Sequence, residues 1–237
     1  MRFPPPIPAT NPVDGHDASL SSPAEPVARF TRFFRNLVDA TALHDVPFIL
    51  LIAGLLTTFM GIYTILYYIN LFAIQKTSTA MELSSSILII LNGASTVGRI
   101  LPSALADRIG PIHVLAATAL LSGVMAFCIL SIDSAAGIVV WAIVFGSTAG
   151  AFMGLPAAGV VSVSNTRGNI GARLGMTLGS VGCGVLIAEP IAGAILGRAK
   201  NGWLGLVSWS GALMLAGFVF LASARTTKVG WRTRLVI

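Results

Sequence analysis

The sequence predicts an all-α membrane protein with six transmembrane helices. Of its 237 residues, 55% are hydrophobic and only 10% are charged, against about 25% charged residues in an ordinary soluble domain. The sequence contains six long runs of apolar residues. Within each run polar and apolar residues do not alternate as they do in barrel strands, which argues against a transmembrane barrel. This composition excludes a soluble globular protein, a disordered protein and a typical nucleic-acid binder. The net charge of +6 fits basic loops that orient a membrane protein.

The first part of the chain is polar. Residues 1–28 hold seven of the twelve prolines, and this composition predicts a disordered cytoplasmic N-terminus. Residues 29–46 place Phe30, Phe34 and Leu37 on one helical face beside several arginines. That pattern predicts a short amphipathic helix along the membrane surface, with a solvated linker as the alternative.

Residues 47–223 are expected to form the six-helix bundle, since each apolar run reaches the roughly 20 residues that cross a bilayer. The expected spans are 47–72, 83–105, 112–132, 135–155, 172–196 and 203–222. Lysine and arginine in the connections set the orientation. Twelve of the 15 basic residues fall on one side, so both termini, including the basic tail at 224–237, are expected in the cytoplasm.

Two charged side chains are expected inside the membrane, Arg99 and Glu189. Charges there are costly and usually face a cavity or a partner. Their depths in the second and fifth spans differ by roughly 12 Å, which argues against a direct salt bridge. Because burial favours the neutral form of a carboxyl group, Glu189 is a candidate for proton coupling, and a tolerated polar residue is the alternative.

Polar residues also line one face of each of the first two spans. Asn92, Ser95 and Arg99 share a face of the second span. Tyr63, Tyr67 and Asn70 share a face of the first span. Two such faces predict a water-filled translocation path in which a cation holds an acidic solute. The alternatives are an Arg99 that snorkels to the membrane surface and tyrosines that serve ordinary helix packing.

Glycines recur at every fourth position in the fourth and fifth spans. They are Gly146, Gly150 and Gly154, and then Gly171, Gly175 and Gly179. Small residues at this spacing let helix backbones approach closely. Pro156 and Pro190 are expected to bend or break their helices.

A longer motif joins the second and third spans, Gly98-Arg99-Ile-Leu-Pro-Ser-Ala-Leu-Ala-Asp107-Arg108-Ile-Gly110-Pro111. It resembles the GxxxDRxG loop motif of the major facilitator superfamily. The stretches 145–156, 170–176 and 186–193 resemble the monocarboxylate transporter-like branch of that family, especially its fungal members. The likeness covers about residues 35–222.

The resemblance implies one half of a major facilitator fold, helices seven to twelve of a twelve-helix secondary transporter. Such a transporter moves a small organic acid or a secondary metabolite by alternating access, as proton symport or as efflux. By resemblance, Arg99 matches the arginine linked to binding of the substrate anion. Asp107, Arg108 and Gly110 match the gating loop.

The sequence departs from the family pattern at several positions. Ser95 stands where animal monocarboxylate carriers have an aspartate, and Ser103 replaces the first glycine of the loop motif. Ala188 and Glu189 stand where the family often has Gly-Pro. These departures bear on gating and on the choice of substrate.

A six-helix half is expected to need a partner in the lipid bilayer, either a separate six-helix half or a second copy in a homodimer. The expected location is the plasma membrane, by resemblance. The alternative function is a truncated, non-transporting half-transporter or a membrane interaction subunit. An enzyme, a metal site and a cofactor are not expected, because HExxH and GxSxG are absent and the histidines are scattered.

Overall fold

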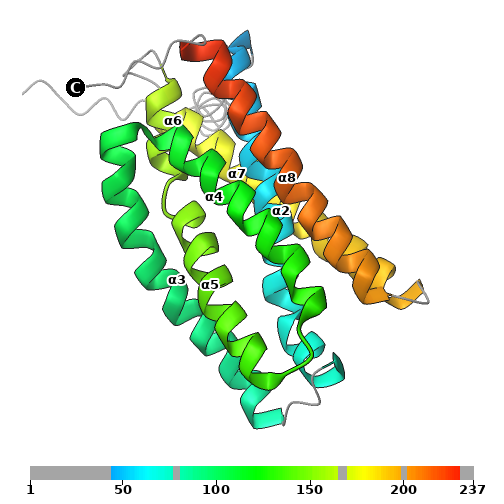
Figure 1. Ribbon diagram of the computed structural model, residues 1–237. Coiled ribbons are helices and arrows are strands. Elements are labelled where there is room, and N and C mark those ends of the chain that lie inside the picture. The colour runs from blue at the N-terminus through cyan, green and yellow to red at the C-terminus, as the bar shows by residue number, and fades with distance from the viewer. Residues whose placement is uncertain (1–43, 77–80, 165–169, 199–201, 230–237) are drawn as a thin grey trace, which may run out of the picture. The chain divides into compact units, whose positions relative to one another are not determined.

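The computed structural model describes residues 44–76, 81–164, 170–198 and 202–229, all within one compact unit of the chain, residues 36–237. This part of the chain forms helices and no strand (Figure 1). Six stretches are long and apolar enough to cross a membrane, which confirms the predicted all-α membrane class. Residues 1–43, with the expected disordered stretch and most of the expected amphipathic helix, lie outside the described residues.

The helices follow the predicted order of spans. The first three spans are α2 (Val46–Lys76), α3 (Met81–Ile109) and α4 (Pro111–Cys128), the last extended by the 3-10 turn η2 (Ile129–Ser131). The fourth span consists of two helices, α5 (Ala135–Met153) and α6 (Pro156–Val163). The last two spans are α7 (Ile170–Arg198) and α8 (Gly202–Val229). Helix α8 therefore continues into the first residues of the segment expected as a basic tail.

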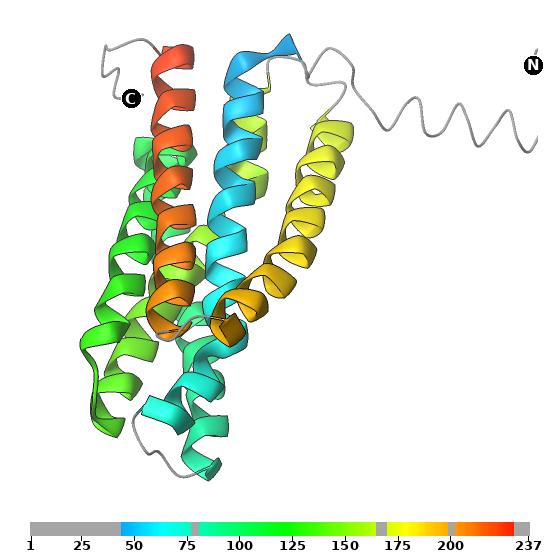
Figure 2. The same ribbon diagram turned by 90° about the vertical axis from the view of Figure 1, so that its right-hand side faces the viewer.

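The two prolines have different effects on their helices. Pro156 begins α6, after Gly154 and Leu155 have separated it from α5. Proline is tolerated in a first helical turn because the amide hydrogen that it lacks would have no partner there. Pro190 lies inside α7, which continues through it and follows a curved course in Figure 2.

Helix α2 packs most extensively against α8 and also contacts α7 widely. The close approach of α2 and α8 depends on glycine. A Cβ atom at Gly61 would lie 2.6 Å from the carbonyl oxygen of Ser210. The hydroxyl of Ser210 donates a hydrogen bond to the carbonyl of Gly61 at 2.5 Å, so the backbones of the two helices meet there.

Helices α3 and α5 form the second closely packed pair. Gly146 and Gly150 of α5 lie directly on the backbone of α3. A Cβ atom at Gly146 would lie 2.5 Å from the carbonyl oxygen of Leu91, and one at Gly150 would overlap the backbone of Ser95. The glycine repeat of the fourth span thus lets α5 contact α3 without intervening side chains.

The glycine repeat of α7 behaves differently. A Cβ atom at Gly171, Gly175 or Gly179 would meet nothing within 4 Å. These glycines alternate with the buried residues of α7, which begin at Arg173 and Thr177. These three glycines therefore lie on the open face of α7, and the close packing expected for them is not seen in the described part of the chain.

Candidate functional site

A cavity of about 430 Å³ lies between α2, α3, α5 and α7. Its polar lining comes from α2, α3 and α7. These residues are Tyr63, Tyr67, Asn92, Ser95, Arg99 and Glu189. Its volume falls within the range of about 300–1,000 Å³ that is typical of sites for small organic molecules.

The remaining walls of the cavity are apolar. They are formed by Leu66, Leu88, Leu91, Ala149, Met153 and Val185. The combination of an apolar wall with a few polar groups is typical of sites that hold an amphipathic small molecule. The apolar part would contact the body of a ligand, and the polar groups would orient it.

Helix α3 supplies three of the polar groups because positions i, i+3 and i+7 of a helix share one face. The side-chain amide of Asn92 donates a hydrogen bond to the carbonyl of Leu88 at 2.9 Å, and Ser95 is 5% exposed. Arg99 is exposed on the cavity side. Its guanidinium makes no ion pair or hydrogen bond with the described residues. A guanidinium without such contacts is available to bind a carboxylate ligand.

Helix α7 brings Glu189 to the same cavity. Its Oε2 atom is buried and has no hydrogen-bond partner among the described residues. Its backbone carbonyl accepts a long hydrogen bond of 3.5 Å from the Tyr68 hydroxyl. Although Arg99 and Glu189 line one cavity, no ion pair joins these two described side chains. The cavity therefore holds one cationic and one acidic group that are separate.

Other residues singled out in the sequence lie elsewhere. Asn70 follows Tyr63 and Tyr67 along α2 but does not line the cavity. Asp107 and Arg108 are exposed and belong to the last turn of α3, not to a loop.

Gly110 alone separates α3 from α4. Its φ is 95°, a conformation that glycine adopts readily because it has no Cβ atom. Pro111 then starts α4 with a φ already suited to a helix. The expected gating loop is therefore a one-residue turn, which holds the ends of two spans close together.

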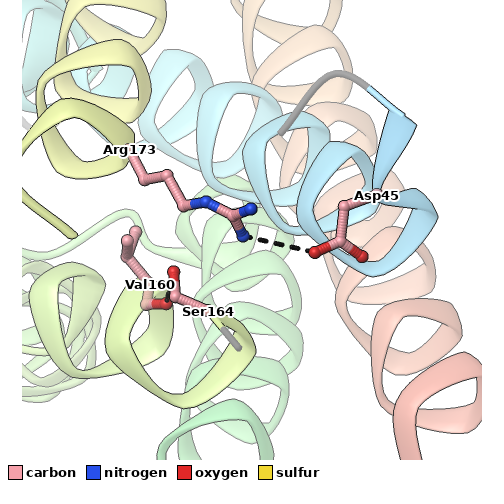
Figure 3. A network of polar contacts seen from close by, with 4 residues as sticks. All are labelled: Asp45, Val160, Ser164 and Arg173. Carbon is pink, nitrogen blue, oxygen red and sulfur yellow. Dashed lines mark hydrogen bonds and ion pairs between the residues drawn. The ribbon is translucent and has the colours of Figure 1, made fainter. Parts of the chain in front are cut away.

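An ion pair with a buried arginine was not predicted from the sequence. Arg173 is 4% exposed, and its Nη1 atom lies 3.2 Å from Oδ2 of Asp45 (Figure 3). A signal for its burial exists in the sequence. Thr177 and Val181 follow Arg173 at helical spacing, so all three share one face of α7. The series marks one face of α7 as a contact face, and the arginine falls on it.

Comparisons with the sequences of known proteins place this chain in a family, although no family model matches the chain. The MFS-type transporter dbaD of Emericella nidulans is 38% identical over 187 residues, which are 78% of this chain and 42% of that protein. The agnestins efflux protein AgnL12 of Paecilomyces divaricatus is 31% identical over 198 residues, 84% of this chain and 45% of that protein. The MFS-type transporter hasB of Aspergillus fumigatus is 32% identical over 227 residues, 90% of this chain and 50% of that protein.

The chain is a half-domain of the major facilitator (MFS) kind. It spans between 34% and 50% of the length of these and similar curated relatives. The six membrane-spanning-type helices are consistent with half of such a fold. In this half-domain, the cavity between α2, α3, α5 and α7 is the site at which the polar residues of three spans meet.

Proposed function

We propose that the half-domain forms part of the substrate path of a secondary transporter, which carries a small organic acid or secondary metabolite by alternating access. The observation that carries this proposal is the cavity, in which Arg99 lies beside apolar walls and has no partner among the described residues. A cation in such surroundings attracts a carboxylate. Two relatives are named efflux proteins for agnestins and for aspyridones, which supports a metabolite as the solute.

We further propose Glu189 as the proton-coupling group of this path. If Arg99 and Glu189 are both charged, the empty cavity is neutral, and entry of a carboxylate would leave one uncompensated negative charge. An unpaired charge in a low-dielectric site is costly, so protonation of Glu189 would accompany binding of the anion. This coupling corresponds to proton symport with the acid.

The path would be completed by a second six-helix half or by a second copy of the chain. Tyr67 supports this proposal, because it lines the cavity but is 70% exposed in the described structure. In the proposed assembly the chain supplies helices seven to twelve, lies in the plasma membrane and has both termini in the cytoplasm. The alternative remains a non-transporting half or a membrane interaction subunit.

The test is flux through liposomes that contain the full chain. Labelled benzoate and lactate serve as aromatic and aliphatic monocarboxylate probes, with and without a pH gradient. We expect uptake above that of protein-free liposomes, and Arg99→Ala should lower it at least about tenfold, because a charge-assisted contact contributes about 1.5–3 kcal/mol. Arg99→Lys should retain part of the activity.

Arg198→Ala is the matched control, since Arg198 is an exposed cation of α7 outside this cavity. It should leave uptake unchanged. If the correctly inserted chain moves neither probe under any gradient, transport by the isolated polypeptide is rejected. The interaction-subunit alternative is then favoured.

A further inference from the structure

The starting ends of α2 and α7 are joined by the ion pair of Asp45 and Arg173, in which the arginine is buried. These residues are 128 positions apart in the sequence, and the two side chains are 23% and 4% exposed. Figure 3 shows the guanidinium reaching from α7 to the carboxylate at the start of α2. The pair therefore ties together two helices that both line the cavity.

The position of Arg173 is unfavourable without its partners. It lies in the first turn of α7, where the helix dipole repels a cation, and burial adds a desolvation cost. Asp45 offsets both effects, and the Phe48 ring adds a cation–π contact, with its centroid 5.2 Å from Cζ of Arg173. The Asp45 carbonyl accepts hydrogen bonds from the backbone amides of Phe48 and Ile49 at 2.9 and 3.0 Å. The acidic partner is thus fixed at the first turn of α2.

The other buried positions of α7 carry side chains no larger than valine. After Arg173 they are Thr177, Val181, Gly184, Ala188 and Ala192. A shift of four residues along the helix, about 6 Å, would bring Val181 to the place of Thr177 and Ala188 to the place of Gly184. Leu174, Val185 and Leu196 add apolar contacts beside this face. The Asp45–Arg173 pair adds a polar contact that only one register can make, and a polar pair is a well-attested device for fixing register.

The register of α7 decides which residue reaches the cavity. Glu189 lies on α7 well beyond Arg173, and a one-turn shift would bring Val185 or Gly193 to its place. We infer that the Asp45–Arg173 pair sets the register of α7 against α2 and so holds Glu189 in the cavity. Arg173 is thus a positioning residue that acts through α7. The inference concerns helix position and does not require that the chain transports anything.

Cysteine cross-linking of the full chain in membranes tests this register. A Cβ atom at Gly184 lies 3.0 Å from Cγ of Leu56, so Leu56→Cys with Gly184→Cys reports the native register by disulfide formation. Leu56→Cys with Ser180→Cys and Leu56→Cys with Ala188→Cys report α7 displaced by one turn in either direction, and the two are read together as the displaced pair. All pairs are built with Cys128→Ser and Cys183→Ser, because these native thiols are unpaired. The cross-linked fraction is read as protection of thiols from a polyethylene-glycol maleimide.

We expect the native pair to cross-link readily and the displaced pair poorly in the parent. Arg173→Gln and Asp45→Asn should each lower the native cross-link at least about threefold and raise the displaced one, because the alternative register becomes comparable in free energy. Arg173→Lys should restore the parental pattern. Arg198→Gln, at the other end of α7, should not alter it.

Two outcomes would overturn the inference. One is an unchanged native cross-link in both Arg173→Gln and Asp45→Asn. The other is loss of the native cross-link without any gain in the displaced pair, which indicates that the ion pair stabilises the fold but does not choose the register. If Arg173→Gln fails to insert in the membrane, Asp45→Asn decides between the same outcomes.

Discussion

At Glu189, α7 carries a carboxyl group into a cavity whose cation, Arg99, makes no ion pair with it. Among the described residues, Tyr63 and Tyr67 of α2 line the same cavity, and the Tyr68 hydroxyl donates to the backbone carbonyl of Glu189. If Glu189 exchanges the coupled proton, Glu189→Gln should flatten the pH dependence of uptake. The ratio of probe uptake at acidic pH to that at neutral pH should fall toward one, measured in the liposome assay.

The matching control for this variant is Asp107→Asn, which neutralises an exposed carboxylate of α3 away from the cavity. It should alter the amplitude of uptake but leave its pH dependence in place. A parental pH profile in Glu189→Gln would assign Glu189 a structural role.

The backbone conformation of Gly110 is one that residues with a Cβ atom rarely adopt. Its φ of 95° lies in a region that costs most other residues about 1–3 kcal/mol. Gly110→Ala should lower the free energy of unfolding by about that amount, measured by thermal unfolding of the detergent-solubilised chain. Gly93→Ala, at an exposed site inside α3 with nothing near its Cβ position, should be neutral or stabilising. Equal effects of the two variants would contradict the strain argument.

At the scale of elements, the two glycine repeats make a matched comparison. Gly150→Ala places a methyl group against the backbone of Ser95 and should destabilise the α3–α5 pair by about 1–3 kcal/mol, as overpacking does. Gly175→Ala adds the same methyl group where nothing lies within 4 Å. It should be neutral or stabilise α7, because alanine favours a helix over glycine by roughly 1 kcal/mol. The melting temperatures of the two variants in detergent measure the difference.

A lower melting temperature for Gly175→Ala than for Gly150→Ala would reverse this assignment. It would mean that the open face of α7 is covered by another part of the assembly in the solubilised protein.

Across the whole described bundle, the helices differ in how much of their apolar surface is buried. In the apolar windows of α2 and α4, 50% of residues are buried, against 22% in α7. Local opening needs less free energy where fewer contacts are lost. Amide hydrogen exchange of the detergent-solubilised chain, followed by mass spectrometry, should therefore be faster in α7 than in α2 and α4. Equal protection of α7 and α2 would contradict this.

Much of the fold follows from local sequence. Six apolar runs predict six spans because each must satisfy its backbone inside the bilayer as a helix. Helical periodicity likewise placed Asn92, Ser95 and Arg99 on one face of α3, and the structure finds all three at the cavity. Asn70 fits the same periodicity on α2 but does not line the cavity. Periodicity shows which face of a helix a residue occupies, but it does not show how far along that face a cavity extends.

The sequence by itself determined the membrane class, the number of spans and the polar faces, since these depend on composition and on spacing within one helix. Only the tertiary structure decided that Arg99 and Glu189 share a cavity and that Arg173 is buried against Asp45. It also decided that Gly146 and Gly150 of α5 pack closely while the glycine repeat of α7, which begins at Gly171, does not. The physical reason is that burial and pairing depend on which faces of distant helices meet. Small residues are compatible with several packing arrangements of two helices, and the contacts of the assembled bundle select one of them.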